Sequence, residues 1–286
     1  MDYNKPWYWL NDDSRAFLAR GYLGDGQTAE ERVREITDRA EVLLKKDGFS
    51  DKLYDYVSRG WVSFSSPVWA NFGVSKGLPI SCFGSYVDDN MGSILFSHAE
   101  VGMMTKFGGG TSATFGALRG RGEEISGNGH SSGSVHFMQL FDSLIDVVSQ
   151  GSVRRGTFAA YLPIEHPDIM EFLDLNTEGN PIQGINYAVT VTNEWLQSMK
   201  GGDEEKRAIW ARVLQRRGEI GYPYIMFIDN ANDGRPEVYK DKDLQIYASN
   251  VCSEIMLPSK DDWSFVCCLS SVNVLFYEDW KDTDLI

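Results

Sequence analysis

Three residues at alternate positions near the end of the chain carry groups that can do chemistry on a sugar. Asn250 supplies an amide, Cys252 a thiol and Glu254 a carboxylate. In an extended or looped segment, residues i, i+2 and i+4 project to one side, so the three groups would share one face. A hydrogen-bonding amide, a sulfur and a general base form a set suited to a polyhydroxylated substrate. The N-x-C-x-E pattern alone is short and arises by chance in many proteins.

The spacing of the cysteines limits the kinds of chemistry that they can perform. The chain has four cysteines, Cys82, Cys252, Cys267 and Cys268, without the regular spacing of a small disulfide-stapled scaffold. Neither a C-x₂₋₄-C pair nor histidines at metal-ligand spacing are present, so we predict no metal site. What remains is either inert core cysteines or thiol chemistry in a reducing compartment.

Composition excludes several classes of protein. The 286 residues are 42% hydrophobic and 13% aromatic, which is typical of a core-forming chain rather than a disordered one. A net charge of −14 repels phosphate backbones and argues against a nucleic-acid partner. The sequence has no run of 18 apolar residues and no signal-peptide core at its start, so we expect a soluble, cytoplasmic protein without a membrane partner.

The first 62 residues predict a helical segment without chemistry of its own. Thr28 and Glu31 have the spacing of a capping box and open a helix whose apolar residues recur every three to four positions as far as Leu44. We expect Gly48 to close this helix. A second short helix is expected over 51–58, ending at Gly60.

After this segment the pattern changes to strands that alternate with helices. Such alternation predicts an α/β fold with a largely parallel sheet or barrel. The expected strands are 79–87, 111–115, 157–163, 187–192, 224–228 and 265–275, and the expected helices are 91–106, 135–148, 167–175 and 204–217.

The stretch from Asn250 to Pro258 resembles the finger loop of the large, catalytic subunit of class I ribonucleotide reductases. The resemblance runs in order from Ser63 to Leu275. It implies that residues 63–286 form the first half of a ten-stranded α/β barrel with a central finger loop. The other matching stretches are Ser65-Ser-Pro67, Ser81-Cys82, Asp88-Asp89, Lys106, Gly108-Gly-Gly110, 118–123, 149–156, 221–227 and 267–270.

The resemblance implies a role for each residue of the N-x-C-x-E pattern. A thiyl radical at Cys252 would abstract the ribose 3′ hydrogen, Glu254 would take the 3′-hydroxyl proton as general base, and Asn250 would bind the ribose hydroxyls. Ser66 and Ser81 are implied substrate contacts, although serines at strand ends commonly just satisfy the backbone.

Loss of the 2′-hydroxyl as water needs two electrons, and the resemblance implies that the dithiol of Cys82 and Cys267 supplies them. Cys268 is the competing candidate. The Leu-Ser that follows sets a register that favours Cys267, and adjacent strand residues face opposite sides, so only one thiol can reach Cys82. We therefore expect Cys268 to be a buried core thiol.

A second implied site binds an effector deoxynucleotide or ATP. Asp89 matches a ribose-hydroxyl contact, and Lys106 and Arg119 match phosphate contacts. Gln150 and Arg154 would lie on a loop that links effector to substrate. The alternative is that these charges are simply solvated, but a local basic cluster in an acidic chain and glycine-flanked arginines favour phosphate binding.

The resemblance also implies partners. The chain is shorter than half of a usual large subunit, so we expect a companion C-terminal fragment and an inactive isolated chain. No cofactor is expected to bind this chain directly, because a metal-containing small subunit would generate the radical. A thioredoxin- or glutaredoxin-type reductant and a homodimer of the assembled subunit are also implied, in the cytoplasm of the cell or of a phage host.

Two other functions remain open. An adenosylcobalamin-dependent reductase shares the chemistry, but that branch usually has proline and glycine inside the finger motif, where this chain has Val251 and Ser253. A non-catalytic nucleotide-binding regulator would keep the effector arginines and lose the need for the thiols. Its weakness is that Asn250, Cys252 and Glu254 are all intact.

Overall fold

The computed structural model describes residues 2–148 and 155–285, which group into two compact units. The first unit contains residues 2–81 and 268–285, and the second contains 82–148 and 155–267. Strand β1, which crosses the boundary expected at residue 62, and helix α4, which follows it, both lie in the first unit. The two units are defined by compactness, whereas the expected boundary marks where the family barrel begins. The boundary at residue 62 therefore stays a prediction. Within the described ranges, no helix has the length and apolar character needed to cross a membrane.

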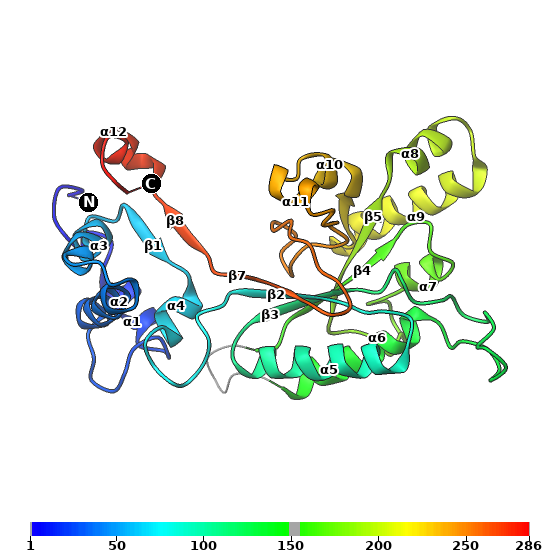
Figure 1. Cartoon of the computed structure of the whole chain (residues 1–286), viewed down its shortest axis with the longest axis horizontal. Coiled ribbons are helices and arrows are strands. Elements are labelled where there is room, and N and C mark those ends of the chain that lie inside the picture. The colour runs from blue at the N-terminus through cyan, green and yellow to red at the C-terminus, as the bar shows by residue number, and fades with distance from the viewer. Residues whose placement is uncertain (1, 149–154, 286) are drawn as a thin grey trace. The chain divides into compact units, whose positions relative to one another are not determined.

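The first unit is mainly helical and includes a two-stranded sheet. β1 pairs antiparallel with β8, so the last part of the unit returns to its first part. Trp61, Phe276 and Trp280 form a small buried cluster that holds the returning segment. The elements are α1 (Asp12–Leu18), α2 (Ala29–Leu44), α3 (Phe49–Ser58), β1 (Val62–Phe64), α4 (Ser66–Asn71), β8 (Ser270–Val272), the 3₁₀ helix η1 (Val274–Phe276) and α12 (Tyr277–Trp280) (Figure 1).

The capping box predicted for α2 is present. The Thr28 hydroxyl accepts from the Glu31 backbone N–H, and the Glu31 carboxylate accepts from the Thr28 backbone N–H. The prediction that Gly48 closes this helix is wrong. Lys45 ends α2 in the left-handed conformation, and Gly48 instead precedes α3 as its N-cap.

The second unit is the α/β part of the chain. Its six-stranded sheet has the order β6-β5-β4-β3-β2-β7, in which β2 to β6 run parallel and β7 runs antiparallel to β2 at one edge. The strands are β2 (Cys82–Tyr86), β3 (Gly110–Thr114), β4 (Phe158–Pro163), β5 (Asn186–Val191), β6 (Tyr224–Phe227) and β7 (Phe265–Cys267). The helices are α5 (Met91–Lys106), α6 (Ser134–Val147), α7 (Ile169–Leu173), α8 (Asn193–Lys200), α9 (Glu204–Ile220), α10 (Ile228–Asp233) and α11 (Glu237–Asp241).

The α/β fold with a largely parallel sheet is confirmed, although the sheet is open rather than a closed barrel. One expected strand is wrong in extent. Residues 265–275 form β7, β8 and η1 instead of one strand, and the break after Cys267 places the two short strands in different units. The helix expected over 167–175 is also shorter, because Asp168 is the N-cap of α7.

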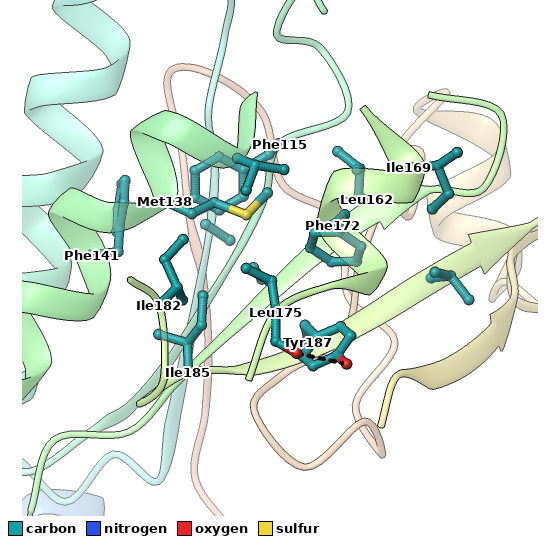
Figure 2. Packing of buried hydrophobic residues seen from close by; sticks show 14 of the residues in the cluster. Phe115, Met138, Phe141, Leu162, Ile169, Phe172, Leu175, Ile182, Ile185 and Tyr187 are labelled. Atoms are coloured by element: carbon teal, nitrogen blue, oxygen red, sulfur yellow. Dashed lines mark hydrogen bonds between the residues drawn. The ribbon is translucent and has the colours of Figure 1, made fainter. Parts of the chain in front are cut away.

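Alternation along β4 explains how the sheet buries two faces. Phe158, Ala160 and Leu162 point to the main core, whereas Ala159 and Tyr161 point to the opposite face. Helices α5 to α9 contribute apolar side chains to the main core, so they cover one face of the sheet. Figure 2 shows this packing, including the Tyr187 hydroxyl that donates to the Leu175 carbonyl.

The opposite face of the sheet is covered by irregular chain rather than by long helices. Ile246, Ala248 and Val251 pack there against Tyr161 and Met226. The segment that holds the N-x-C-x-E pattern is therefore seated on the sheet by its own apolar residues.

Candidate active site

Cys82 and Cys267 lie directly opposite each other in the antiparallel β2–β7 ladder. Opposed residues of such a ladder have Cα atoms about 4.5–5.5 Å apart, which is within the span of a disulfide. Their side chains point to the same face of the sheet. The structure thus brings together the two thiols that the resemblance assigned to the redox pair.

The two thiols also influence each other electrostatically. Hydrogen bonding with the Cys82 thiol, and then burial, raises the pKa of the Cys267 thiol. Neither cysteine forms a disulfide in the structure. A raised pKa keeps Cys267 protonated near neutral pH, which is the state that a donor of electrons and protons requires.

Cys268 does not share this face. Its Sγ lies 3.1 Å from the Pro79 carbonyl oxygen, to which it donates. The expectation of a buried core thiol is wrong, because the Cys268 side chain is exposed. Cys268 comes directly after the last residue of β7, and its thiol donates to a main-chain carbonyl instead of entering a core.

The N-x-C-x-E segment forms a tight turn. The Ser253 N–H donates to the Asn250 carbonyl at 3.1 Å, and Ser253 adopts a φ of 65°. Cys252 therefore stands at the exposed corner of the turn, while Asn250 is fully buried at its base. We call residues 249–255 the finger turn.

The Asn250 side chain links the finger turn to the redox strands. Its Nδ2 donates to the Glu254 carboxylate at 2.7 Å and to the Cys82 Sγ at 3.1 Å. Its Oδ1 accepts from the backbone N–H groups of Glu254 and Ile255, both at 3.0 Å. One side chain thus joins the candidate general base to one of the two redox thiols.

Two residues that the sequence did not single out hold the finger turn on the sheet. The Tyr161 hydroxyl donates to the Asn250 carbonyl at 2.8 Å, and the Ser112 hydroxyl donates to the Ser249 carbonyl at 2.8 Å. Burial raises the pKa of Tyr161 to about 12. The alternation of β4 places Tyr161 off the main core, and a buried tyrosine on that face is the signal that could have indicated it.

The implied substrate serines lie in the first unit. Ser66 is the first residue of α4, and Ser81 immediately precedes β2. Ser81 is 6% exposed, and its hydroxyl has no hydrogen-bonding partner within the part of the chain that the structure describes. The hydroxyl is thus buried and unpartnered one residue before Cys82 in the sequence.

Asp89 and Arg119 contact each other. The Asp89 carboxylate accepts from the Arg119 Nε at 2.7 Å, its Nη2 at 2.6 Å and its backbone N–H at 3.2 Å. Both side chains are about one-third exposed or less. The structure brings these two predicted effector residues together as a partly exposed ion pair.

Lys106 does not join this pair. It is the last residue of α5, whereas Asp89 lies just before the first residue of that helix. A helix of this length spans about 24 Å, so Lys106 and Asp89 are at opposite ends of it. Gln150 and Arg154 lie outside the described residues.

A buried cluster that sequence reasoning missed holds the loop that carries Arg119. The Asp168 carboxylate accepts from the Arg121 N–H at 2.8 Å and from the Ser134 N–H at 2.7 Å. His166 accepts from the Asp168 N–H at Nδ1, so its Nε2 carries the proton that it donates to the Leu118 carbonyl at 2.7 Å. The sequence predicted only that a helix begins at Pro167, which lies between these two residues.

Across residues 2–148 and 155–285, no group of three or more His, Cys, Asp or Glu side chains is placed to hold a metal ion. The finger turn and the redox strands bring thiols, a carboxylate and an amide together.

Comparison with known proteins identifies the family. The family model described as "Ribonucleotide reductase, barrel domain" matches residues 80–207 and 203–284. The chain belongs to the ribonucleotide reductase family, which confirms the resemblance found in the finger turn and in the redox strands.

Several relatives agree with this assignment. The α subunit of a class Id ribonucleotide reductase from Actinobacillus ureae is 56% identical, with a TM-score of 0.94 over 99% of this chain and 52% of that one. The putative ribonucleoside-diphosphate reductase large subunit of Frog virus 3 is 34% identical over 84% of this chain and 45% of the relative. A vitamin B12-dependent ribonucleoside-diphosphate reductase from Thermoplasma acidophilum is 30% identical over 92% of this chain and 35% of the relative. The chain thus spans between 35% and 52% of the length of these relatives.

Proposed function

We propose that this chain supplies the redox pair and the finger turn of a ribonucleoside-diphosphate reductase of class I. The observation that carries the proposal is the direct opposition of Cys82 and Cys267, with Asn250 joining Cys82 to Glu254. This arrangement links a two-electron donor to a carboxylate base in the turn that also carries the exposed Cys252 thiol. The substrate is a ribonucleotide, and the product is its 2′-deoxy form.

The proposed steps balance in atoms and electrons. A thiyl radical on Cys252 takes the ribose 3′ hydrogen, so an S–H bond forms as a C–H bond breaks. Glu254 accepts the 3′-hydroxyl proton, a proton from the Cys82–Cys267 dithiol joins the 2′ hydroxyl, and the 2′ C–O bond breaks as water leaves. The dithiol then gives a hydrogen atom to C2′ and its last electron to the C3′ carbonyl, so it has lost two electrons and two protons and becomes a disulfide. Glu254 returns its proton to the 3′ oxygen. Cys252 returns its hydrogen to C3′, and a dithiol protein of the thioredoxin or glutaredoxin type then reduces the disulfide.

Substrate contacts are proposed for two serines in addition to the finger turn. Ser81 precedes Cys82 in the sequence, and its hydroxyl is buried without a partner among the described residues. A hydroxyl that lacks a partner supports a hydrogen bond to a bound substrate. Ser66 is the first residue of α4, and its role as a substrate contact is carried over from the family resemblance. Both hydroxyls are proposed to bind the nucleotide rather than to take part in the chemistry.

Effector binding is proposed at the Asp89–Arg119 pair. The guanidinium is a bidentate partner suited to phosphate, and the carboxylate is suited to a ribose hydroxyl. A nucleotide bound there would exchange part of the existing ion pair for its own contacts. Lys106, Gln150 and Arg154 keep their proposed effector roles, with Lys106 acting at the other end of α5.

Partners follow from the same proposal. A metal-containing small subunit would deliver the radical, so this chain would bind no cofactor of its own. Catalysis would also need the part of the relatives' length that this chain does not match, whether on the same polypeptide or on a companion one. Exposed apolar residues on α5 and α6 support a homodimer of the assembled subunit, working in a reducing cytoplasm; they are Met91, Leu95, Phe96, Met103, Leu140 and Val147.

The class II alternative is supported by the B12-dependent relatives at 25–30% identity. Class I is favoured by the 56% identity to a class Id α subunit and by Val251 and Ser253 in the finger turn. Turnover that requires adenosylcobalamin and no second radical-generating subunit would decide for class II.

The test is an assay of the assembled large subunit with a radical-generating subunit and a dithiol reductant. Conversion of ribonucleoside diphosphate to its deoxy form should be lost in Cys252→Ser. Cys268→Ser is the matched control and should retain turnover, because its thiol lies off the redox face. Activity that survives Cys252→Ser would overturn the proposal and favour a vestigial, regulatory chain.

A further inference from the structure

Strand β7 carries Cys267, and few main-chain hydrogen bonds hold this strand to β2. It has three residues, lies at the edge of the sheet and pairs only with β2 among the described strands. Short edge strands fray because few main-chain hydrogen bonds oppose their separation. The alignment of Cys267 with Cys82 therefore needs additional contacts.

One carboxylate on α5 supplies such contacts. A single oxygen of Glu100, Oε2, accepts from the Ser85 hydroxyl at 3.0 Å and from the Ser264 hydroxyl at 2.8 Å. Gly84 pairs with Phe265, so continuing the antiparallel register by one step sets Ser85 opposite Ser264. Glu100 thus bridges β2 and the start of β7 on the face that α5 covers.

The opposite face of the same two strands is fastened by packing. A Cβ atom added at Gly84 would lie 2.1 Å from the Phe265 ring, which shows that the ring occupies the space above the glycine. Phe265 is buried. The two strands are therefore joined by Glu100 on one face and by Phe265 on the other, two residues from the paired thiols.

We propose that Glu100 is a positioning residue for the redox pair, which it serves by keeping β7 in register with β2. The inference rests on the proposed function, because it assumes that Cys82 and Cys267 form a disulfide during turnover. Without the bridge, β7 separates from β2 more often and the effective concentration of one thiol near the other falls. Loss of the bridge would therefore lower the equilibrium constant for forming the Cys82–Cys267 disulfide, and not only the overall stability of the chain.

The experiment measures that disulfide directly in the full chain. Cys252 and Cys268 are replaced by serine, and the chain is equilibrated in mixtures of reduced and oxidised glutathione. Each disulfide formed between Cys82 and Cys267 converts one oxidised glutathione to two reduced molecules. After acid quenching, peptide mass mapping gives the equilibrium constant for disulfide formation.

Glu100→Ala should lower this equilibrium constant about tenfold, because two hydrogen bonds that align the strands are lost. Glu100→Gln keeps an oxygen that can accept from both hydroxyls and should restore most of it. Ser264→Ala removes one donor only and should have an intermediate effect. Ser97→Ala is the matched control, since Ser97 also lies on α5 and donates to β2, at the Tyr86 carbonyl, but not to β7.

The outcomes separate this inference from the proposed function. An equilibrium constant unchanged in Glu100→Ala, while the parent chain forms the disulfide, overturns the role of Glu100 and leaves the redox pair intact. Failure of the parent chain to form any disulfide between Cys82 and Cys267 overturns the proposed redox chemistry itself. An equal loss in Ser97→Ala and Glu100→Ala would show a general loosening of α5, which also contradicts the proposal.

Discussion

The Asn250 side chain donates to the Cys82 Sγ at 3.1 Å, although the two residues are 168 positions apart in the sequence. The same amide nitrogen donates to Glu254, so the finger turn and β2 are connected through one buried group. Any movement of the turn therefore changes the surroundings of a redox thiol. The radical-forming and electron-donating parts of the proposed site form one hydrogen-bonded unit.

The first prediction concerns this connection. Asn250→Ala should lower the free energy of unfolding by about 2–3 kcal/mol, because the backbone N–H groups of Glu254 and Ile255 lose their buried acceptor. Denaturant unfolding of the chain measures the change. Asn128→Ala is the control, because Asn128 is exposed and should shift the value by less than about 0.5 kcal/mol. Equal effects of the two variants would show that the Asn250 contacts carry no stability.

A second prediction uses the raised pKa of Tyr161. Tyr161→Phe removes the hydrogen bond to the Asn250 carbonyl, so it should be less stable than the parent by about 1 kcal/mol at pH 8. The phenol pKa is about 12 in the folded chain and about 10 when unfolded. The phenol's contribution to the free energy of unfolding is complete below pH 10. It is lost as the pH rises through 12, because the unfolded state ionises first.

The parent should therefore lose about 1.4 kcal/mol relative to Tyr161→Phe by about pH 11. Urea unfolding of both proteins between pH 8 and 11 should show the two stabilities converging and then crossing. The other tyrosines titrate alike in both proteins and cancel in the difference. A gap that stays constant or widens with pH would contradict a buried, protonated Tyr161.

The effector proposal yields a third prediction. Arg119→Gln should weaken binding of a deoxynucleoside triphosphate at least about tenfold, because the bidentate phosphate partner is lost. Isothermal titration calorimetry on the purified protein measures the affinity. Arg121→Gln is the matched control, since Arg121 lies on the same loop but pairs with Glu171 at 2.6 Å. Similar losses in both variants would indicate a diffuse effect of charge rather than a site at the Asp89–Arg119 pair.

Local sequence patterns were sufficient for much of the fold. A helix was expected over 91–106, and the structure has α5 over Met91–Lys106, with Asn90 as its N-cap. The pattern failed at 265–275, where β-prone residues continue through a break that only the pairing of β7 with β2 and of β8 with β1 defines. Secondary structure that depends on partners distant in the sequence is not encoded in the local pattern.

The candidate site shows the same division. The resemblance named Asn250, Cys252 and Glu254, but it could not show that Asn250 folds back to Glu254 across a turn. Tyr161 and Glu100 were missed because their roles depend on hydrogen bonds to residues far along the chain. Lys106 was grouped with Asp89 by family motif, while the length of α5 separates them.

The last prediction concerns the exposed apolar face of α5. Phe96 is 64% exposed and Leu95 is 53% exposed, which is costly for a surface that stays in water. If this face forms the proposed homodimer, Phe96→Glu should shift the protein from dimer to monomer in sedimentation velocity at micromolar concentration. Burying an unpaired carboxylate in an apolar interface is strongly unfavourable. Leu43→Glu is the control, because Leu43 is 56% exposed on α2 and should leave the dimer intact. A dimer that persists in Phe96→Glu and dissociates in Leu43→Glu would contradict this prediction and show that the interface lies on the first unit.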